Sequence, residues 1–291
     1  MNWLPLAFLS AALSATAAIF EKKALFKLGA LEFSFLISLF GAVFALPFYL
    51  TIDFASLSIT NLTVLYIKTI FGTLAFLNVM YAIKNLEISN ALPLIVLTPG
   101  IVAITAFFLL GDQLSSLEII GMLLLLIGTY TLEANNRSLL EPFQVFYKSK
   151  DHRYIVFALL LFTITSVMDR LLVSNLRMPP FTFMAFQQSF QLINFFILML
   201  VFRKGFSVGL AGSGKSTLII VITIAALTII YRWSQIEAVK LAPVALVLSV
   251  KRTSVFFTSA IGGKIFKESN LIRRIIATCI MIAGALFIIN N

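Results

Sequence analysis

Apolar windows of about 20 residues alternate with short polar segments along the whole chain. Ten windows can be read, and each approaches the length that a helix needs to cross a hydrocarbon core. Their approximate ranges are 3–22, 31–50, 62–84, 91–110, 115–133, 154–174, 180–202, 216–233, 242–263 and 272–290. This pattern predicts an all-α polytopic membrane protein with ten transmembrane helices. We expect the first window to be a retained helix and not a cleaved leader, because no basic residues precede it.

A motif of Tyr, Glu and Pro, each six residues after the last, occurs twice at an offset of 150 residues. Its members are Tyr81, Glu87, Pro93, Tyr231, Glu237 and Pro243. The motif and the spacing of the apolar windows predict an internal duplication. Five helices per copy would make the second copy enter the membrane from the opposite side, so the repeats would be inverted. The expected parts are a first repeat, a polar loop and a second repeat, at 1–133, 134–153 and 154–291.

Basic residues are concentrated in the segments that follow odd-numbered windows. These segments hold 15 Lys and Arg, against at most four in the segments after even-numbered windows. The positive-inside rule then places the basic segments in the cytoplasm and both termini outside. The net charge of +10 fits this topology and anionic headgroups, with no sign of a nucleic-acid surface. We expect a multi-pass protein of the plasma membrane, with the lipid bilayer as its partner.

Composition narrows the possible functions. Only 12% of the residues are charged, about half the fraction of a soluble protein, and the mean hydropathy is +1.03. Cys279 is the only cysteine and His152 the only histidine. We therefore expect no intrachain disulfide, no metal site and no cofactor. No constellation of His, Cys and carboxylates suggests an enzyme. The sequence does not define an oligomeric state.

The segment Gly209–Ser216 fits the Walker A pattern, with Lys215 at the position that reaches phosphate. A working P-loop needs a preceding strand and a soluble sheet around it. Here the segment joins two membrane windows, which leave no room for such a domain. We expect a flexible Gly/Ser loop with a topogenic lysine, and no ATP binding.

Ionisable residues within membrane spans are costly, by roughly 2.5 kcal/mol or more at a helix centre, so they rank as functional candidates. Lys251 and Arg252 lie in the middle of the ninth window, where the first repeat has Ile101 and Val102. An adjacent ammonium and guanidinium suit a phosphate or carboxylate ligand. The alternative is a structural pair that bonds to backbone carbonyls or to a distant carboxylate such as Asp169.

Other polar residues in the spans could complete a ligand site. Lys68 could join a cationic cavity or extend to an interface. Gln187, Gln191 and Asn194 share one helix face, which would point to a cavity or to another helix.

The equivalent tyrosines Tyr81 and Tyr231 stand at window ends, as interface anchors or as gate and ligand contacts. We interpret Asp169–Arg170 and Glu21–Lys22 as boundary pairs, although either carboxylate could carry a coupling proton.

The repeated Tyr and Pro pattern resembles the drug/metabolite transporter superfamily, in its EamA-type branch. Asp112 and Glu268 occupy the place of the acidic residue in that family's Leu-Gly-Glu signature. The resemblance implies ten helices, inverted five-helix repeats, a central cavity and no ATPase activity. The ninth window is also similar to that of sugar-phosphate translocators, whose Lys-Arg pair binds phosphate. This likeness implies that Lys251 and Arg252 are anion ligands, with Tyr231 as a partner.

We expect a secondary transporter that moves a small, anionic organic metabolite by alternating access. Exchange, facilitated flow and proton coupling all remain open. One alternative is an exporter of amino acids or cationic drugs. Another is a membrane protein that does not transport, such as a scaffold or a flippase subunit.

Overall fold

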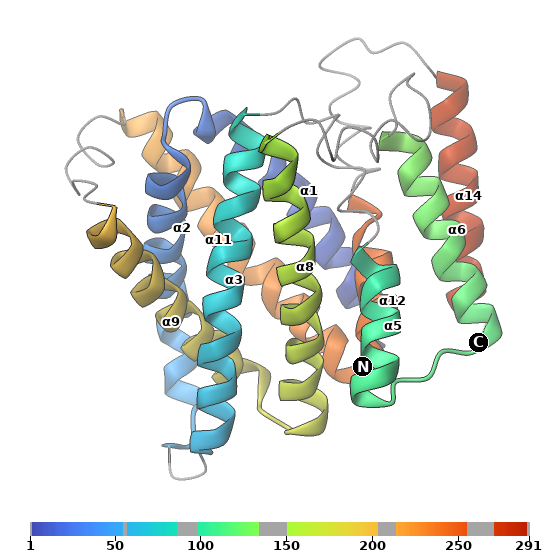
Figure 1. Cartoon of the computed structure of the whole chain (residues 1–291), viewed down its shortest axis with the longest axis horizontal. Helices are drawn as coiled ribbons and strands as arrows, with labels where there is room; N and C mark the ends of the chain where they lie inside the picture. The colour runs from blue at the N-terminus through green and yellow to red at the C-terminus, as the bar shows by residue number, and fades with distance from the viewer. Residues whose placement is uncertain are drawn as a thin grey trace.

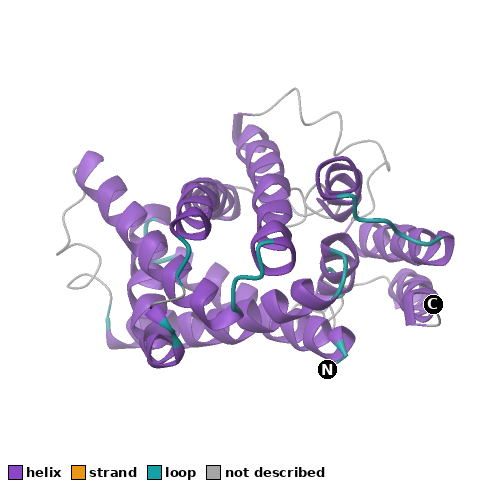
Figure 2. Cartoon of the chain, turned by 90° about the horizontal axis from the view of Figure 1, so that it is seen from below, coloured by secondary structure: helices purple, strands orange, loops and turns teal. Residues whose placement is uncertain are grey.

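The computed structural model describes residues 2–54, 57–85, 98–133, 150–202, 214–254 and 271–289. Every regular element within these ranges is a helix, as Figure 2 shows from below. The helices stand side by side in one bundle, with both chain termini toward its lower end in Figure 1. An all-helical membrane protein is the fold class that the apolar windows predict.

Most of the helices belong to three consecutive groups along the chain. The first group is α1 (Trp3–Leu25), α2 (Ala30–Ala45), the 3₁₀ helix η1 (Leu46–Thr51) and α3 (Ile59–Asn85). The second is α5 (Thr98–Leu110), α6 (Ser116–Glu133), α8 (Lys150–Arg170) and the π-helix η3 (Leu171–Asn175). The third is α9 (Pro180–Val201), α11 (Lys215–Leu241), α12 (Val244–Lys251) and α14 (Leu271–Ile289).

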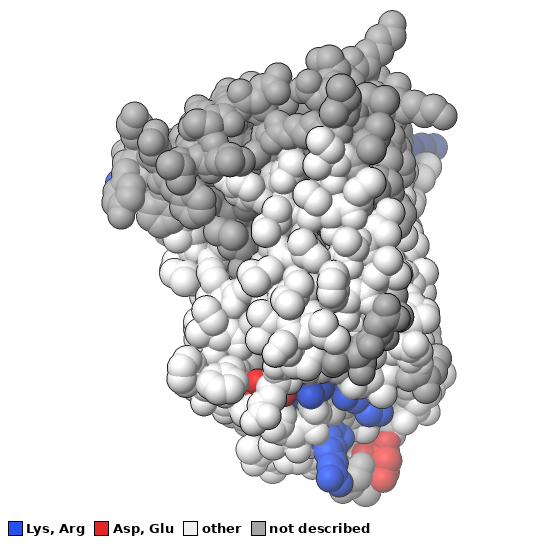
Figure 3. Space-filling model, turned by 90° about the vertical axis from the view of Figure 1, so that its right-hand side faces the viewer, with Lys and Arg blue, Asp and Glu red and all other residues white. Residues whose placement is uncertain are grey.

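Six helical segments of the described residues are long and apolar enough to cross a membrane. They are Trp3–Leu25, Ala30–Thr51, Ile59–Ala82, Val156–Asn175, Pro180–Val201 and Lys215–Leu241. Shorter apolar helices accompany them in α5, α6 and α14. On the face shown in Figure 3, uncharged side chains cover the middle of the molecule and charges gather at its lower end. Such a belt is what a bilayer requires of an integral membrane protein.

The helices pair across the two halves of the chain. Three pairs join counterparts by order: α2 with α9, α5 with α12, and α6 with α14. Two further pairs are crossed, since α1 packs on α11 and α3 packs on α8. Because these contacts run between the halves, neither half forms a separate bundle.

Glycines allow the closest of these approaches, between α6 and α14. A Cβ atom on Gly121 would lie 2.7 Å from the backbone oxygen of Gly284, and one on Gly284 would lie 2.7 Å from the oxygen of Gly121. A Cβ on Gly128 would lie 2.9 Å from the oxygen of Ala277. Small residues at a membrane helix interface let the backbones meet, and packing then holds the pair.

The predicted window ends differ most from the structure in α11. The apolar pattern ends at residue 233, but the helix continues to Leu241. Arg232, Glu237 and Lys240 interrupt the hydropathy without ending the helix, because none of them breaks helical backbone geometry. Pro243 then precedes α12, as predicted, since a proline costs little at a helix start. Pro93 lies outside the described residues.

Two apolar clusters form the core. One includes Leu65, Phe183 and Ile236, and the other includes Leu77 and Phe195. Along α3 and α9 the polar residues that form the site lie between members of these two clusters. The site therefore occupies a polar layer inside an otherwise apolar bundle.

Candidate functional site

A buried ion network joins four helices in the polar layer. Lys68 Nζ of α3 lies 2.7 Å from Asp169 Oδ1 of α8 and donates to Gln187 Oε1 of α9 over 2.5 Å. Arg232 Nη2 of α11 lies 3.2 Å from Asp169 Oδ2 and 3.2 Å from the same Gln187 oxygen. Two cations thus share one carboxylate and one amide oxygen. The ammonium of Lys68 also lies 4.9 Å from the centre of the Phe183 ring.

Helix geometry explains why these residues meet. Lys68 is nine residues from the start of α3 and Gln187 seven residues from the start of α9. Arg232 is nine residues before the end of α11. At 1.5 Å per residue these positions lie about 10–14 Å from helix ends that share one side of the bundle. Similar depth on adjacent helices brings the side chains together.

A second group of cations comes from the end of α12. Lys251 Nζ donates to Gln235 Oε1 over 2.6 Å and lies 4.7 Å from the centre of the Tyr231 ring. Arg252 Nη2 donates to Thr98 Oγ1 of α5 over 3.2 Å. Both printed partners are neutral oxygens, and Asp169 is bonded to other cations. The specific carboxylate suggested as a structural partner for this pair therefore serves Lys68 and Arg232.

The two groups are electrostatically connected. The charges of Arg232, Asp169 and Glu21 all act on Lys251, and so does that of Arg252. Four cations and two carboxylates thus interact in this part of the bundle. Burying charge costs several kcal/mol per ion unless partners compensate it, so an excess of cations favours a bound anion.

The remaining predicted residues differ in their placement. Asn194 Nδ2 of α9 donates to Thr73 Oγ1 of α3 over 3.4 Å, so it bonds to another helix. Gln191 is partly buried on the same helix. Tyr81 stacks on Tyr154 at 5.7 Å, near the opposite end of α3 from its start. Gln187 therefore joins the ion network directly, whereas the printed contacts of Asn194 and Tyr81 lie elsewhere.

Three interpretations of the sequence need correction. Lys68 is 4% exposed and bonded within the bundle, so it does not extend to an interface. Tyr231 lies ten residues inside α11 and does not mark a helix end. Asp169 and Arg170 are not a boundary pair with each other, because they bond to different partners.

Arg170 joins two parts of the chain at the lower end of the bundle. Its Nη1 donates to the backbone oxygens of Val239 and Ala242 over 2.6 and 3.0 Å, at the end of α11. Its Nε lies 3.4 Å from Asp112 Oδ2 in the connection between α5 and α6. Asp112, which stands in the place of the family's signature carboxylate, is therefore a partner in a link between the halves.

Sequence reasoning missed Arg232 and Gln235 as site residues. Arg232 was counted among loop cations because the apolar window ended beside it. A helical reading through the repeated motif would have found both, since Tyr231 and Gln235 are four residues apart and share a helix face. Glu21 was noted only as one of the boundary carboxylates.

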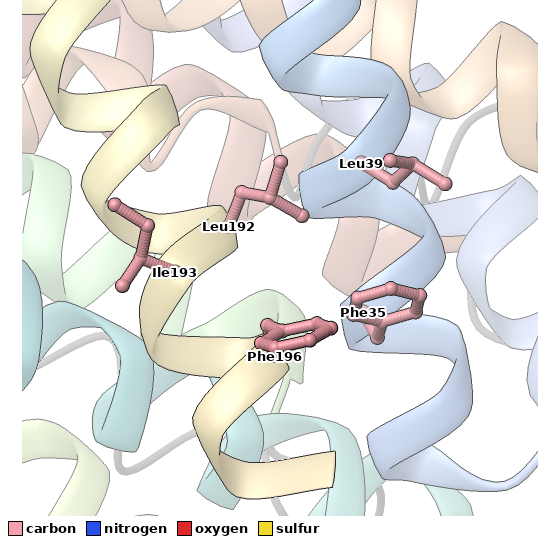
Figure 4. A pocket seen from close by; sticks show the side chains of 5 residues that line it. All are labelled: Phe35, Leu39, Leu192, Ile193 and Phe196. Atoms are coloured by element: carbon pink, nitrogen blue, oxygen red, sulfur yellow. The ribbon is translucent and has the colours of Figure 1, made fainter. Parts of the chain in front are cut away.

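Two other features do not belong to this site. A groove between α2 and α9 is lined by Phe35, Leu39, Leu192, Ile193 and Phe196, as Figure 4 shows. No polar side chain lines it, so it offers nothing to a charged ligand. Of the Walker-like segment, residues 209–213 lie outside the described residues, and Lys215 and Ser216 begin α11.

Comparison with known proteins bears on what such a bundle is. Residues 1–133 match the EamA-like transporter family. That family consists of transporters and not enzymes, so the match suggests a membrane transporter of the drug/metabolite type. No curated protein matches the sequence significantly. A protein of known crystal structure is similar over 98% of this chain and 95% of its own, with a TM-score of 0.70 and 16% identity. At that identity the likeness concerns the fold alone.

Proposed function

We propose that this EamA-like chain is a secondary carrier for a small organic anion. The observation that carries the proposal is the gathering of Lys68, Arg232, Lys251 and Arg252 in one polar layer of an apolar bundle. Charged groups inside a membrane protein commonly mark a substrate pathway. Arginine can hold a carboxylate or phosphate bidentately, and lysine adds a compact charge.

Transport by alternating access is supported by the way the helices pair. Exchanging the two halves turns the α1–α11 contact into the α8–α3 contact, and both occur. The same exchange relates α1–α12 to α8–α5, and α2–α11 to α9–α3, and all four contacts occur. Such a pattern is expected of two inverted five-helix repeats, at 1–133 and 154–291 with the segment 134–153 between them. Repeats of this kind rock about a site near the bilayer midplane.

The experiment measures thermal unfolding of the purified chain with a panel of ligands. The panel holds phosphate, sugar phosphates, nucleotide sugars, dicarboxylates, amino acids and cationic drugs. A ligand that binds only the folded state raises the unfolding midpoint, by an amount that grows with its concentration. We expect a shift from an anion class, which the variant Lys251→Met/Arg252→Gln loses.

The matched control is Lys240→Met, which removes an exposed lysine from α11. It should leave the ligand-dependent shift unchanged. A shift from amino acids or cations that survives Lys251→Met/Arg252→Gln would contradict the proposal and favour an exporter. Uptake of the same anion into liposomes that contain only this chain would distinguish a carrier from a scaffold or flippase subunit.

A further inference from the structure

Arg232 differs from the other members of the buried ion network. Its side chain retains 19% exposure, whereas those of Lys68 and Asp169 retain 5% and 4%. Arg232 therefore borders accessible space while the Lys68–Asp169 pair lies behind it. The residue before it, Tyr231, supports Lys251 through its ring. Arg232 is thus the member of the network placed between the carboxylate and the cations of α12.

The two contacts of Asp169 are unequal. Its distance to Lys68 is 2.7 Å and its distance to Arg232 is 3.2 Å. If Arg232 turned away, Lys68 would still neutralise the carboxylate. This matters because an uncompensated buried charge is strongly unfavourable. The second cation makes the Arg232 contact exchangeable without exposing Asp169 to that cost.

Lys251 has no such carboxylate within ion-pair distance in the part of the chain described here. Its ammonium donates to the neutral oxygen of Gln235, and the charge of Arg232 acts on it unfavourably. An anion held between Lys251 and Arg232 would relieve this repulsion. The same anion would take the place of Asp169 at the guanidinium.

We propose that Arg232 is a third cation of the anion site and that Asp169 is its resident counter-anion, which the transported anion displaces. This rests on the proposed function and specifies its ligand. A group facing two or three cations should itself carry two charges. The chemical class is therefore a phosphate monoester, inorganic phosphate or dicarboxylate, and a guanidinium binds each of these through paired oxygens.

The test measures apparent affinity for inorganic phosphate and, separately, for succinate. Each is titrated against the thermal unfolding midpoint of the purified full chain, at constant ionic strength balanced with chloride. Asp169→Asn should tighten binding of the recognised anion roughly tenfold, because Arg232 no longer has a competing charge. Arg232→Gln should weaken binding roughly tenfold, and Arg232→Lys should restore part of the loss.

A double variant separates competition from structure. In the Arg232→Gln background, Asp169→Asn should no longer tighten binding, because the two residues act on the same contact. Matched controls are Asp53→Asn and Arg153→Gln, which change exposed charges and should leave affinity unchanged. If Asp169→Asn folds poorly, Lys68→Met/Asp169→Leu removes the buried pair together and should tighten binding likewise.

The outcomes distinguish the two proposals. Binding that is lost in Lys251→Met but unaffected by Asp169→Asn and Arg232→Gln would overturn the displacement and leave the anion carrier standing. Weaker binding in Asp169→Asn would also overturn it, because the carboxylate would then support the ligand. No shift of the wild-type midpoint by phosphate, succinate or any other anion would overturn both.

Discussion

A single aromatic ring has two neighbours of opposite character in the site. Tyr231 lies under the Lys251 ammonium at 4.7 Å, and the next residue in the helix, Arg232, bonds to Asp169. A ring face attracts a cation through its quadrupole, and the attraction grows when both are desolvated. Tyr231 therefore compensates part of a charge whose hydrogen-bond partner, Gln235, is neutral.

The role of the ring predicts different outcomes for two substitutions. Tyr231→Phe keeps the aromatic face and should change the free energy of unfolding little. Tyr231→Leu should lose about 0.5–2 kcal/mol from the cation–π contact, in addition to any packing loss. The measurement is thermal or denaturant unfolding of the purified protein without ligand.

A double-mutant cycle isolates the contact. With Lys251→Met in place, Tyr231→Leu should lose only its packing component, so the two changes should be non-additive. Additive costs would show that the ring and the ammonium do not interact energetically.

Which site residues can be predicted from the sequence depends on how visible each charge is. Lys68, Gln187, Lys251 and Arg252 were found because each interrupts an apolar window. Arg232 was missed because it stands where the apolar signal fades, although the helix does not. The pairing of Lys68 with Asp169 could not be predicted, since the residues are 101 positions apart and meet only through the packing of α3 on α8.

At the scale of elements, α6 and α14 depend on the absence of side chains. Gly121 and Gly284 approach each other so closely that a Cβ on either would lie 2.7 Å from the opposite backbone oxygen. A backbone atom cannot move aside as the end of a flexible side chain can. The two helices would therefore have to separate to admit even a methyl group.

Gly121→Ala should destabilise the protein by about 1–3 kcal/mol through overpacking. The matched control is Gly72→Ala in α3, where the nearest atom to the added carbon would be 3.9 Å away. That change should be neutral or slightly stabilising, because alanine favours helix over glycine. Unfolding midpoints of the two variants provide the comparison, and equal effects would contradict the close approach of α6 and α14.

The helices themselves were well anticipated from hydropathy, because a membrane span needs a long apolar run. The ends were less predictable. The α11 helix continues eight residues beyond its apolar window, since Arg170 bonds to the backbone oxygens at its end and the site accepts its charges. The α2 window ends in a 3₁₀ turn, η1, that contains Pro47.

At the scale of the whole molecule, the structure gives the bundle two unlike ends. Both termini lie toward the lower end in Figure 1, where Arg170 links Asp112 to the end of α11. The connections from α1 to α2 and from α9 to α11 lie toward the other end. Lysines at Lys22, Lys23 and Lys27 belong to the first of these connections.

This asymmetry predicts the orientation in the membrane. Lys and Arg are retained on the cytoplasmic side, so the end with the basic connections should face the cytoplasm and both termini should lie outside. A C-terminal alkaline phosphatase fusion should be active and a C-terminal green fluorescent protein fusion dark. A fusion of the phosphatase after residue 140 should give the opposite result, which controls for expression. Replacing Lys22, Lys23 and Lys27 by Gln should weaken the preference, because the first basic connection contributes most of the early signal. If the C-terminal fluorescent fusion is bright, the site opens to the two compartments in reverse order, and the network at Asp169 faces the cytoplasm rather than the outside.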